Sequence, residues 1–209
     1  MKQRSFDYGI ELKKRRNSLF KELFRKTIHL LSAFVPFFLR LNYSFTIFLL
    51  IFALIMYSVC EFLRLKGVEV PVVSKITEVA SRKRDENKFV LGPVTLVIGI
   101  LICSLLWKEN FMAVKIGIFS LSFGDGLASL FGKLFGKQKI PFSQGKTACG
   151  SLACFAAVYI SSFAVCQNCL YSFCFAFFAM ILEIFPLKDL DNILIPVLLG
   201  GFAFFCFDF

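Results

Sequence analysis

The chain has 209 residues, of which 57% are hydrophobic and 29 are Phe, and its mean hydropathy is +0.73. A soluble globule of this length could not bury so much apolar surface, because small globules still expose a large part of the chain. The formal net charge of +10 comes from basic residues in the gaps between apolar runs, which indicates a membrane protein and not a nucleic-acid-binding protein. Composition therefore predicts an all-α fold, a polytopic bundle of transmembrane helices.

Residues 1–26 are polar and basic, and they include no apolar stretch typical of a cleavable signal peptide. We interpret this segment as a cytoplasmic basic arm, followed by a transmembrane domain over residues 27–209. Apolar residues in the arm recur at helical spacing opposite lysines and arginines, a pattern typical of a helix on the membrane surface. A solvated arm is the alternative. The apolar residues are Leu12, Leu19, Phe20, Leu23 and Phe24.

Seven apolar runs follow, and a spanning helix needs about 20 apolar residues, with a range of about 17–25. The first and last runs are short, and Pro36 interrupts the first, so for these two a tilted or re-entrant segment is an alternative to a full span. The sequence thus predicts about seven spans. The runs are 27–40, 43–63, 91–107, 111–132, 147–166, 169–187 and 192–207.

The basic residues predict the orientation of these spans. With a cytoplasmic N-terminus, the inside segments are 1–26, 64–90, 133–146 and 188–191, and they hold 21 of the 24 Lys and Arg residues. Cytoplasmic loops carry such an excess of Lys and Arg. We therefore expect a multi-pass protein of the cell (inner) membrane whose N-terminus faces the cytoplasm.

Ionisable residues in or beside the apolar runs are candidates for function, because a charge at mid-span costs about 2.5–3.5 kcal/mol. Arg25, Lys26 and His29 lie on one helical face where the first run begins, although basic residues at a membrane border also serve as anchors. Glu61 and Arg64 end the second run at the spacing of a helix-surface ion pair, and an ion pair is the role we expect for them.

The fourth run contains Gly124-Asp125-Gly126, in which Asp125 lies eight residues before Lys133. Eight residues correspond to about 12 Å of helix, so Asp125 is predicted to lie well below the membrane surface. The two glycines favour a break in the helix, which would expose backbone groups to an ion or a phosphate. A buried structural Asp is the alternative.

The next loop ends in Gly145-Lys146-Thr147, which is similar to the end of a P-loop. That motif needs a glycine at position 140, where this chain has Ile140, and it follows a strand, for which there is no room here. We therefore interpret Lys146 as a phosphate-binding cation near a helix start. Small residues at a spacing of about four precede the loop, and they permit close helix packing or close approach of a ligand.

Further acidic residues lie on the same predicted side of the membrane. Glu86 belongs to a charged loop, Glu183 ends the sixth run, and Asp191-Asn192 precedes the seventh. Carboxylates, lysines and a glycine-flanked Asp at one leaflet are what a site for Mg²⁺ and a triphosphate needs, since carboxylates bind the metal and cations neutralise the phosphate oxygens.

Four motifs spread over about residues 20–200 resemble one known family. They are Arg25-Lys26-x-x-His29, Gly124-Asp125-x-x-Ala128-Ser129-x-x-Gly132-x-x-x-Gly136-Lys137, Lys146-Thr147-x-x-Gly150 and Asp191-Asn192-x-x-x-Pro196. Together they are similar to the CTP-dependent polyprenol kinase family, which includes dolichol kinase, phytol kinase and CTP-using diacylglycerol kinase. The second motif is the specific one.

The resemblance implies that residues 27–209 form a catalytic domain, which transfers the γ-phosphate of CTP to the hydroxyl of a polyprenol, phytol or diacylglycerol with the help of Mg²⁺. It implies that Arg25, Lys26 and Asp125 are catalytic, with Asp125 as a metal ligand or proton acceptor and Asp191 as a second metal ligand. The other expected phosphate-binding or nucleotide-binding residues are Lys146, Thr147, Gly124, Ser129, Gly132, Lys137 and Asn192; further candidates are His29, Glu61, Glu86 and Glu183.

Two other functions remain open. Phosphatidate cytidylyltransferases carry a related stretch, and Thr147 stands where many of the kinases have Ser; their long C-terminal signature needs a His, and no His follows His29. An ion-coupled transporter with Asp125 as its ion site is the second alternative, and it would favour inverted hydropathy repeats, which the sequence does not show. The lipid alcohol and the oligomeric state, with a dimer as one option, are not determined by the sequence.

Overall fold

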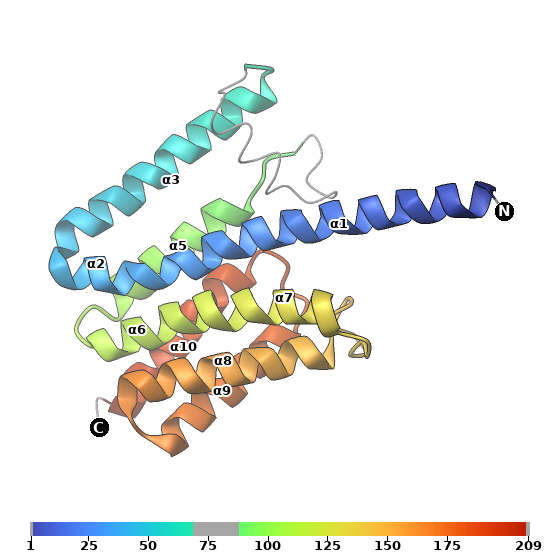
Figure 1. Cartoon of the computed structure of the whole chain (residues 1–209). Helices are drawn as coiled ribbons and strands as arrows, with labels where there is room; N and C mark the ends of the chain where they lie inside the picture. Colours follow the sequence, from blue (N-terminus) through green and yellow to red (C-terminus); the bar gives the residue numbers. More distant parts are fainter. Residues whose placement is uncertain (1, 69–87, 208–209) are drawn as a thin grey trace.

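The computed structural model describes residues 2–68 and 88–207, and within them the side chains from Arg16 onward except that of Ser18. Helices make up the described secondary structure apart from one isolated bridge between Lys139 and Thr147. The predicted all-α helical membrane bundle is confirmed (Figure 1). The helices are α1 (Lys2–Leu31), η1 (Ser32–Phe34), α2 (Val35–Leu41), α3 (Tyr43–Leu65), α5 (Gly92–Leu106), α6 (Phe111–Phe119), η3 (Ser120–Asp125), α7 (Gly126–Phe135), α8 (Ala148–Cys166), α9 (Cys169–Ile184) and α10 (Asp191–Phe207).

Each predicted apolar run corresponds to a helix or to consecutive helical segments. By length and composition, three described helical stretches are sufficient to cross a membrane, namely α3, the stretch Phe111–Phe135 and α8. The shorter apolar helices are α5, α9 and α10. Seven crossings therefore stay a prediction, while the helical character of the runs is confirmed.

The predicted basic arm is helical, and it is continuous with the first apolar run. α1 extends without interruption from Lys2 to Leu31, so the predicted boundary at residue 26 lies inside one helix. Its N-terminal half projects beyond the bundle (Figure 1). Pro36 lies in the first turn of α2, where a missing N–H interrupts no helical hydrogen bond, so a single 3₁₀ turn joins α1 to α2.

Asparagines begin three helices that follow short turns. Asn42 accepts a hydrogen bond from the Phe45 N–H at 3.0 Å, Asn110 from the Met112 N–H at 3.1 Å, and Asn168 from the Leu170 N–H at 3.0 Å. A side-chain oxygen at this position satisfies one of the backbone donors that a helix start leaves unpaired. The turns before α3, α6 and α9 are therefore defined by local sequence.

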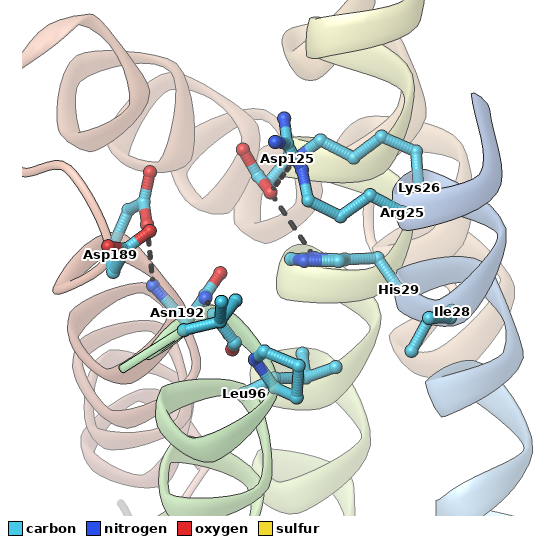
Figure 2. A pocket seen from close by; sticks show the side chains of 12 residues that line it. Arg25, Lys26, Ile28, His29, Leu96, Asp125, Asp189 and Asn192 are labelled. Carbon is cyan, nitrogen blue, oxygen red and sulfur yellow. Dashed lines mark hydrogen bonds and ion pairs between the residues drawn. The ribbon is translucent and has the colours of Figure 1, made fainter. Parts of the chain in front are cut away.

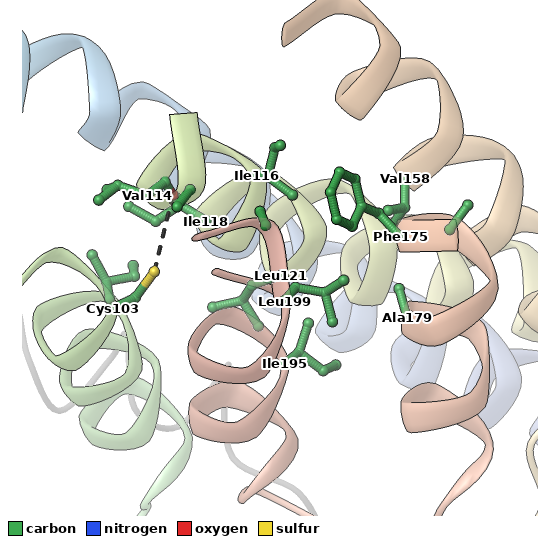
Figure 3. Packing of buried hydrophobic residues seen from close by; sticks show 14 of the residues in the cluster. Cys103, Val114, Ile116, Ile118, Leu121, Val158, Phe175, Ala179, Ile195 and Leu199 are labelled. Atoms are coloured by element: carbon green, nitrogen blue, oxygen red, sulfur yellow. Dashed lines mark hydrogen bonds between the residues drawn. The ribbon is translucent and has the colours of Figure 1, made fainter. Parts of the chain in front are cut away.

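α10 lies at the centre of the bundle and packs against α5, α6 and α9. Its residues Ile195 and Leu199 are buried against Leu121 and Phe175 (Figure 3). Glycine permits this approach, because a Cβ on Gly99 of α5 would lie 2.0 Å from the backbone oxygen of Asn192. Small residues allow close helix packing in membranes, and here they bring the start of α10 beside α5.

α3 diverges from the rest of the bundle (Figure 1). It packs on α2 and α5, and it exposes large apolar side chains, including Phe48, Phe52 and Ile55, along much of its length. An apolar helix of 23 residues with so little protein around it matches a helix surrounded by lipid.

Candidate active site

Asp125 is buried at the centre of the site, at the end of the π-helical turn η3. The predicted break in the helix is absent: α6, η3 and α7 continue one another, and the widened turn carries Asp125. The flanking glycines serve packing, because a Cβ on Gly124 would lie 2.8 Å from the Val158 side chain and one on Gly126 would lie 3.3 Å from Leu30. Single π turns inside α-helices occur frequently at functional sites.

Two side chains of α1 contact the Asp125 carboxylate. The Lys26 ammonium donates a hydrogen bond to it, and the His29 Nδ1 atom lies 3.3 Å from the same oxygen. All three side chains are almost completely buried. Figure 2 shows Arg25, Lys26 and His29 extending from α1 toward η3. The prediction that these α1 residues share one face is confirmed, and the structure adds that this face is directed at Asp125.

Glu22 is a site residue that the sequence reasoning missed. Its buried carboxylate pairs with Arg25 on the next turn of α1 and with Lys133 of α7. Burial raises the pKa of Glu22, but Arg25, Lys133 and Lys26 outweigh this effect and hold the pKa below its ordinary value. The available signal was its position three residues before Arg25 on the same helical face.

Lys146 joins the loop before α8 to the end of α9. Its ammonium donates a hydrogen bond to the backbone oxygen of Glu183 and lies 3.5 Å from the carboxylate of the same residue. The Ser151 hydroxyl donates to the other carboxylate oxygen at 3.0 Å. The buried Glu183 is therefore the counter-ion of Lys146.

Thr147 and the glycines beside it bring α7 and α8 together. The Thr147 hydroxyl accepts a hydrogen bond from the Gly150 N–H at 3.2 Å and thereby caps α8. A Cβ on Gly132 would lie 3.0 Å from that hydroxyl, and one on Gly150 would lie 2.7 Å from the Ala128 oxygen. The spacing of small residues thus serves close helix packing, and Gly132 also lines a cavity.

Two cavities meet at Asp125. The larger has a volume of about 280 Å³ and lies between α1, α7, the loop before α8 and the end of α9. The smaller, of about 30 Å³, lies between α1, η3, α5 and the start of α10 (Figure 2). Both are lined by Arg25, Lys26, Asp125 and Asp191.

The larger cavity carries closely paired charges of both signs. Its basic residues are Arg25, Lys26, Lys133, Lys146 and Lys188, and its acidic residues are Glu22, Asp125, Glu183 and Asp191. Four of the five cations lie within ion-pair distance of one of these acids. Among the described residues, the buried Nε atom of Arg25 has no hydrogen-bond partner. A ligand that carries both phosphates and a cation could replace these ion pairs, because its phosphates would bind the basic side chains and its cation would bind the acidic ones. No buried charge would then be left without a partner.

Most of the predicted site residues line a cavity. Ser129, Gly132, Lys146, Thr147 and Glu183 line the larger one, His29 and Asn192 line the smaller, and four others line both. The Asn192 amide is already bonded to α5, since it donates to the Thr95 hydroxyl at 2.9 Å and to the Gly92 oxygen at 3.3 Å.

Three of the predicted residues that the structure describes do not belong to this assembly. Gly124 is packed against α8, and the exposed Lys137 lines neither cavity. Glu61 is fully buried, pairs with Arg64 at 2.7 Å and accepts the Val90 N–H at 2.9 Å, so the expected ion pair is confirmed. Glu86 lies outside the described residues.

The carboxylates fit a metal ion that arrives with phosphate. Within residues 2–68 and 88–207, no three His, Cys, Asp or Glu side chains are grouped as metal ligands. Mg²⁺, however, is commonly held by one or two carboxylates together with substrate phosphates and water. Asp125 and Asp191 line the same two cavities, and this pair suits such shared coordination.

The sequence of the chain is similar to those of several known proteins. The chain is 32% identical over 135 residues to an uncharacterised protein of Methanocaldococcus jannaschii, covering 65% of this chain and 68% of that protein. It is 27% identical to a probable phytol kinase 1, chloroplastic, of Glycine max, covering 92% of this chain and 70% of that one. It is 33% identical over 85 residues to a farnesol kinase, chloroplastic, of Arabidopsis thaliana, covering 40% of this chain and 27% of that protein. No family model and no solved structure matches.

A helical membrane bundle with a buried Lys–Asp–His cluster, whose named relatives are kinases of phytol and farnesol, is a phosphotransferase of the lipid-alcohol kinase class. The chain is thus similar to kinases of phytol and farnesol, which are members of the polyprenol kinase family. The family resemblance of the four motifs is therefore confirmed.

Proposed function

We propose that the chain transfers the γ-phosphate of CTP to the hydroxyl of a long-chain lipid alcohol, and that this alcohol is an isoprenoid of the phytol or farnesol kind. The observation that carries the proposal is the Lys26–Asp125 pair, buried where a cavity lined by cations adjoins a partly apolar one. Names of relatives favour an isoprenoid alcohol over diacylglycerol. CTP as the donor rests on the motif resemblance.

The larger cavity is the proposed nucleotide site. Its volume of about 280 Å³ and its five cations suit a triphosphate with part of its nucleoside. Arg25 and Lys146 bind phosphate oxygens when the nucleotide enters, and the unpartnered Nε atom of Arg25 supports this role. Positioned cations of this kind stabilise the negative charge on a transferring phosphoryl group.

Asp125 connects the cations to the transferred phosphate. Asp125 and Asp191 would hold Mg²⁺ together with the nucleotide phosphates, and the ion would neutralise charge on the β- and γ-oxygens. Lys26 donates a hydrogen bond to Asp125, so its ammonium would lie close to a phosphate held beside Asp125.

The test is incubation of the purified protein in lipid with Mg²⁺ and CTP labelled separately at the α and γ phosphates. Transfer of the γ label to phytol or farnesol, with release of CDP, is the expected result. Transfer of the α label to phosphatidic acid, with release of pyrophosphate, would instead identify a cytidylyltransferase. Transfer of neither label would refute both and direct attention to transport.

One substitution and its control test whether the nucleotide binds in the larger cavity. Lys146→Ala is expected to raise the KM for CTP at least about tenfold, since one charge-assisted contact to phosphate contributes about 1.5–3 kcal/mol. Lys139→Ala is the matched control, because this exposed lysine of the same loop lines neither cavity. An equal KM in both variants would remove Lys146 from the proposed site.

We also propose that the site faces the cytoplasm in a seven-span protein. The distribution of Lys and Arg supports this orientation. The exposed Cys169 at the start of α9 then lies outside, whereas Cys149 at the start of α8 lies inside. A membrane-impermeant maleimide added to intact cells should label Cys169 and spare Cys149, and the reverse pattern would invert the topology.

A further inference from the structure

The two cavities that meet at Asp125 differ in size and in lining. Lys146 and Glu183 line only the larger one, and His29 lines only the smaller one. The smaller cavity, at about 30 Å³, admits a group of the size of a hydroxyl, because a cavity of about 10–15 Å³ measured in this way already holds a water molecule. A nucleotide has room only in the larger cavity, so the smaller one is available for a different ligand.

The small cavity has an apolar wall and a polar one. The residues of the apolar wall are Ile28 of α1 and, at or just before the start of α5, Val90, Pro93 and Leu96. The polar lining residues are Arg25, Lys26, His29, Asp125, Asp189, Asp191 and Asn192 (Figure 2). In Figure 2 the His29 ring lies between Asp125 and Leu96. A ligand that fits this lining has a polar end next to an apolar body.

The apolar wall lies between α1 and α5, two helices that pack only sparsely against each other among the described residues. Neither α1 and α5 nor α1 and α3 form a packed interface among the described residues, since α3 packs on α2 and α5. Leu91, between the lining residues Val90 and Gly92, is 50% exposed, and Leu31 at the end of α1 is 57% exposed. In a membrane, such side chains face lipid tails. An opening between α1 and α5 would connect the small cavity to the hydrocarbon region.

We propose that the small cavity is the acceptor subsite: the hydroxyl end of a long-chain lipid alcohol enters from the membrane between α1 and α5 and meets His29. This inference rests on the proposed kinase function. The nucleotide occupies the larger cavity, and its terminal phosphate and the hydroxyl meet beside Asp125, the residue that both cavities share.

The transfer step then balances as follows. The alcohol oxygen forms a bond to the terminal phosphorus, the bond from that phosphorus to the bridging oxygen breaks, and the nucleoside diphosphate leaves with the electron pair. The hydroxyl proton passes to an oxygen of the transferred phosphoryl group, and the His29 imidazole orients the acceptor hydroxyl. The Asp125 carboxylate, 3.3 Å from Nδ1, holds the imidazole in this orientation, as a carboxylate does for a catalytic histidine.

A larger side chain in the apolar wall of the small cavity tests the proposed acceptor subsite. Ile28→Phe is expected to raise the KM for phytol about tenfold or more, because hydrophobic pockets discriminate at this scale for small changes of volume, and to leave the KM for CTP unchanged. Leu23→Phe is the matched control, since Leu23 lies on the same helix, is 52% exposed and lines neither cavity. Ile28→Phe with an unchanged KM for phytol would overturn the subsite.

A second measurement requires no turnover. A long-chain alcohol with a diazirine beside its hydroxyl, irradiated with the protein in nanodiscs without nucleotide, should label peptides that contain Ile28 or residues 90–96. His29→Gln should keep this labelling and lower kcat by up to about 10²-fold, because a misplacement of the acceptor by about 1 Å can cost this much. Labelling confined to the loop at residues 143–147, or an unchanged kcat in His29→Gln, would overturn the assignment.

The two proposals fail in different ways. A wild-type protein that phosphorylates phytol but carries no photolabel on α1 or α5 refutes the subsite and leaves the kinase function intact. A protein that transfers phosphate from CTP to no alcohol refutes the kinase function. In that case the photolabel decides by itself whether the cavity binds a lipid alcohol.

Discussion

Replacing Asp125 by Asn leaves the Lys26 ammonium without its buried partner. Lys26 and Asp125 are 2% and 5% exposed, and breaking a buried ion pair by removing one partner costs about 3–5 kcal/mol. We expect the lower end, about 3 kcal/mol, because the pair lines a cavity. For a chain of this length that loss lowers the melting temperature by roughly 6–12 °C. Lys26→Met should cost a similar amount, since it leaves the carboxylate unpaired.

The double variant Lys26→Met/Asp125→Asn removes both charges. We expect it to melt within a few degrees of the wild type and to have no kinase activity, because stability needs only that the two charges be balanced. Heating in detergent with a thiol-reactive fluorophore measures unfolding directly, since Cys103 and Cys154 are buried and free. Lys139→Met is the control for loss of a positive charge. A double variant that loses the sum of the two single effects would refute the pairing.

Three further outcomes follow from the fold. Gly99→Ala should destabilise the protein by about 1–3 kcal/mol, because its Cβ would lie 2.0 Å from the Asn192 oxygen; Gly92→Ala, with nothing within 4 Å of the new carbon, should leave the melting temperature nearly unchanged. Glu22 has a lowered pKa, so its contribution to stability is present above its unfolded pKa, near 4.5, and is lost as the pH falls through the folded value; Glu22→Gln should flatten the melting temperature between about pH 5 and 3. Glu61→Ala should cost about 3 kcal/mol without changing either KM, and a raised KM would place Glu61 in the site after all.

The structure brings together those predicted site residues that were chosen from the positions of charges along apolar runs. Asp125 in the fourth run and Arg25, Lys26 and His29 at the start of the first were identified from the cost of charge in lipid, and they lie together. Lys137 was included because its motif matched, yet its side chain is exposed. A motif gives residue type and spacing, but it does not say which way a loop side chain points.

The sequence by itself determined the helices. Without water in the membrane interior each backbone group must be paired within its own helix, so apolar runs and asparagine caps are sufficient to define α3, α6 and α9, and lysine and arginine placement predicts the sides of the membrane. These signals depend only on residues close together in the sequence, so they can be recognised without the tertiary structure.

Only the tertiary structure decided the partners. Lys26 meets Asp125, which is 99 residues away, and Glu22 meets Lys133, and no local pattern specifies such pairs. Glycines between helices serve packing at Gly99 and Gly124 because the nearest atoms belong to other helices. A charge in a low-dielectric interior is tolerated only beside a counter-charge, so the arrangement of helices determines which charges form the active site and which, like Glu61, hold the fold together.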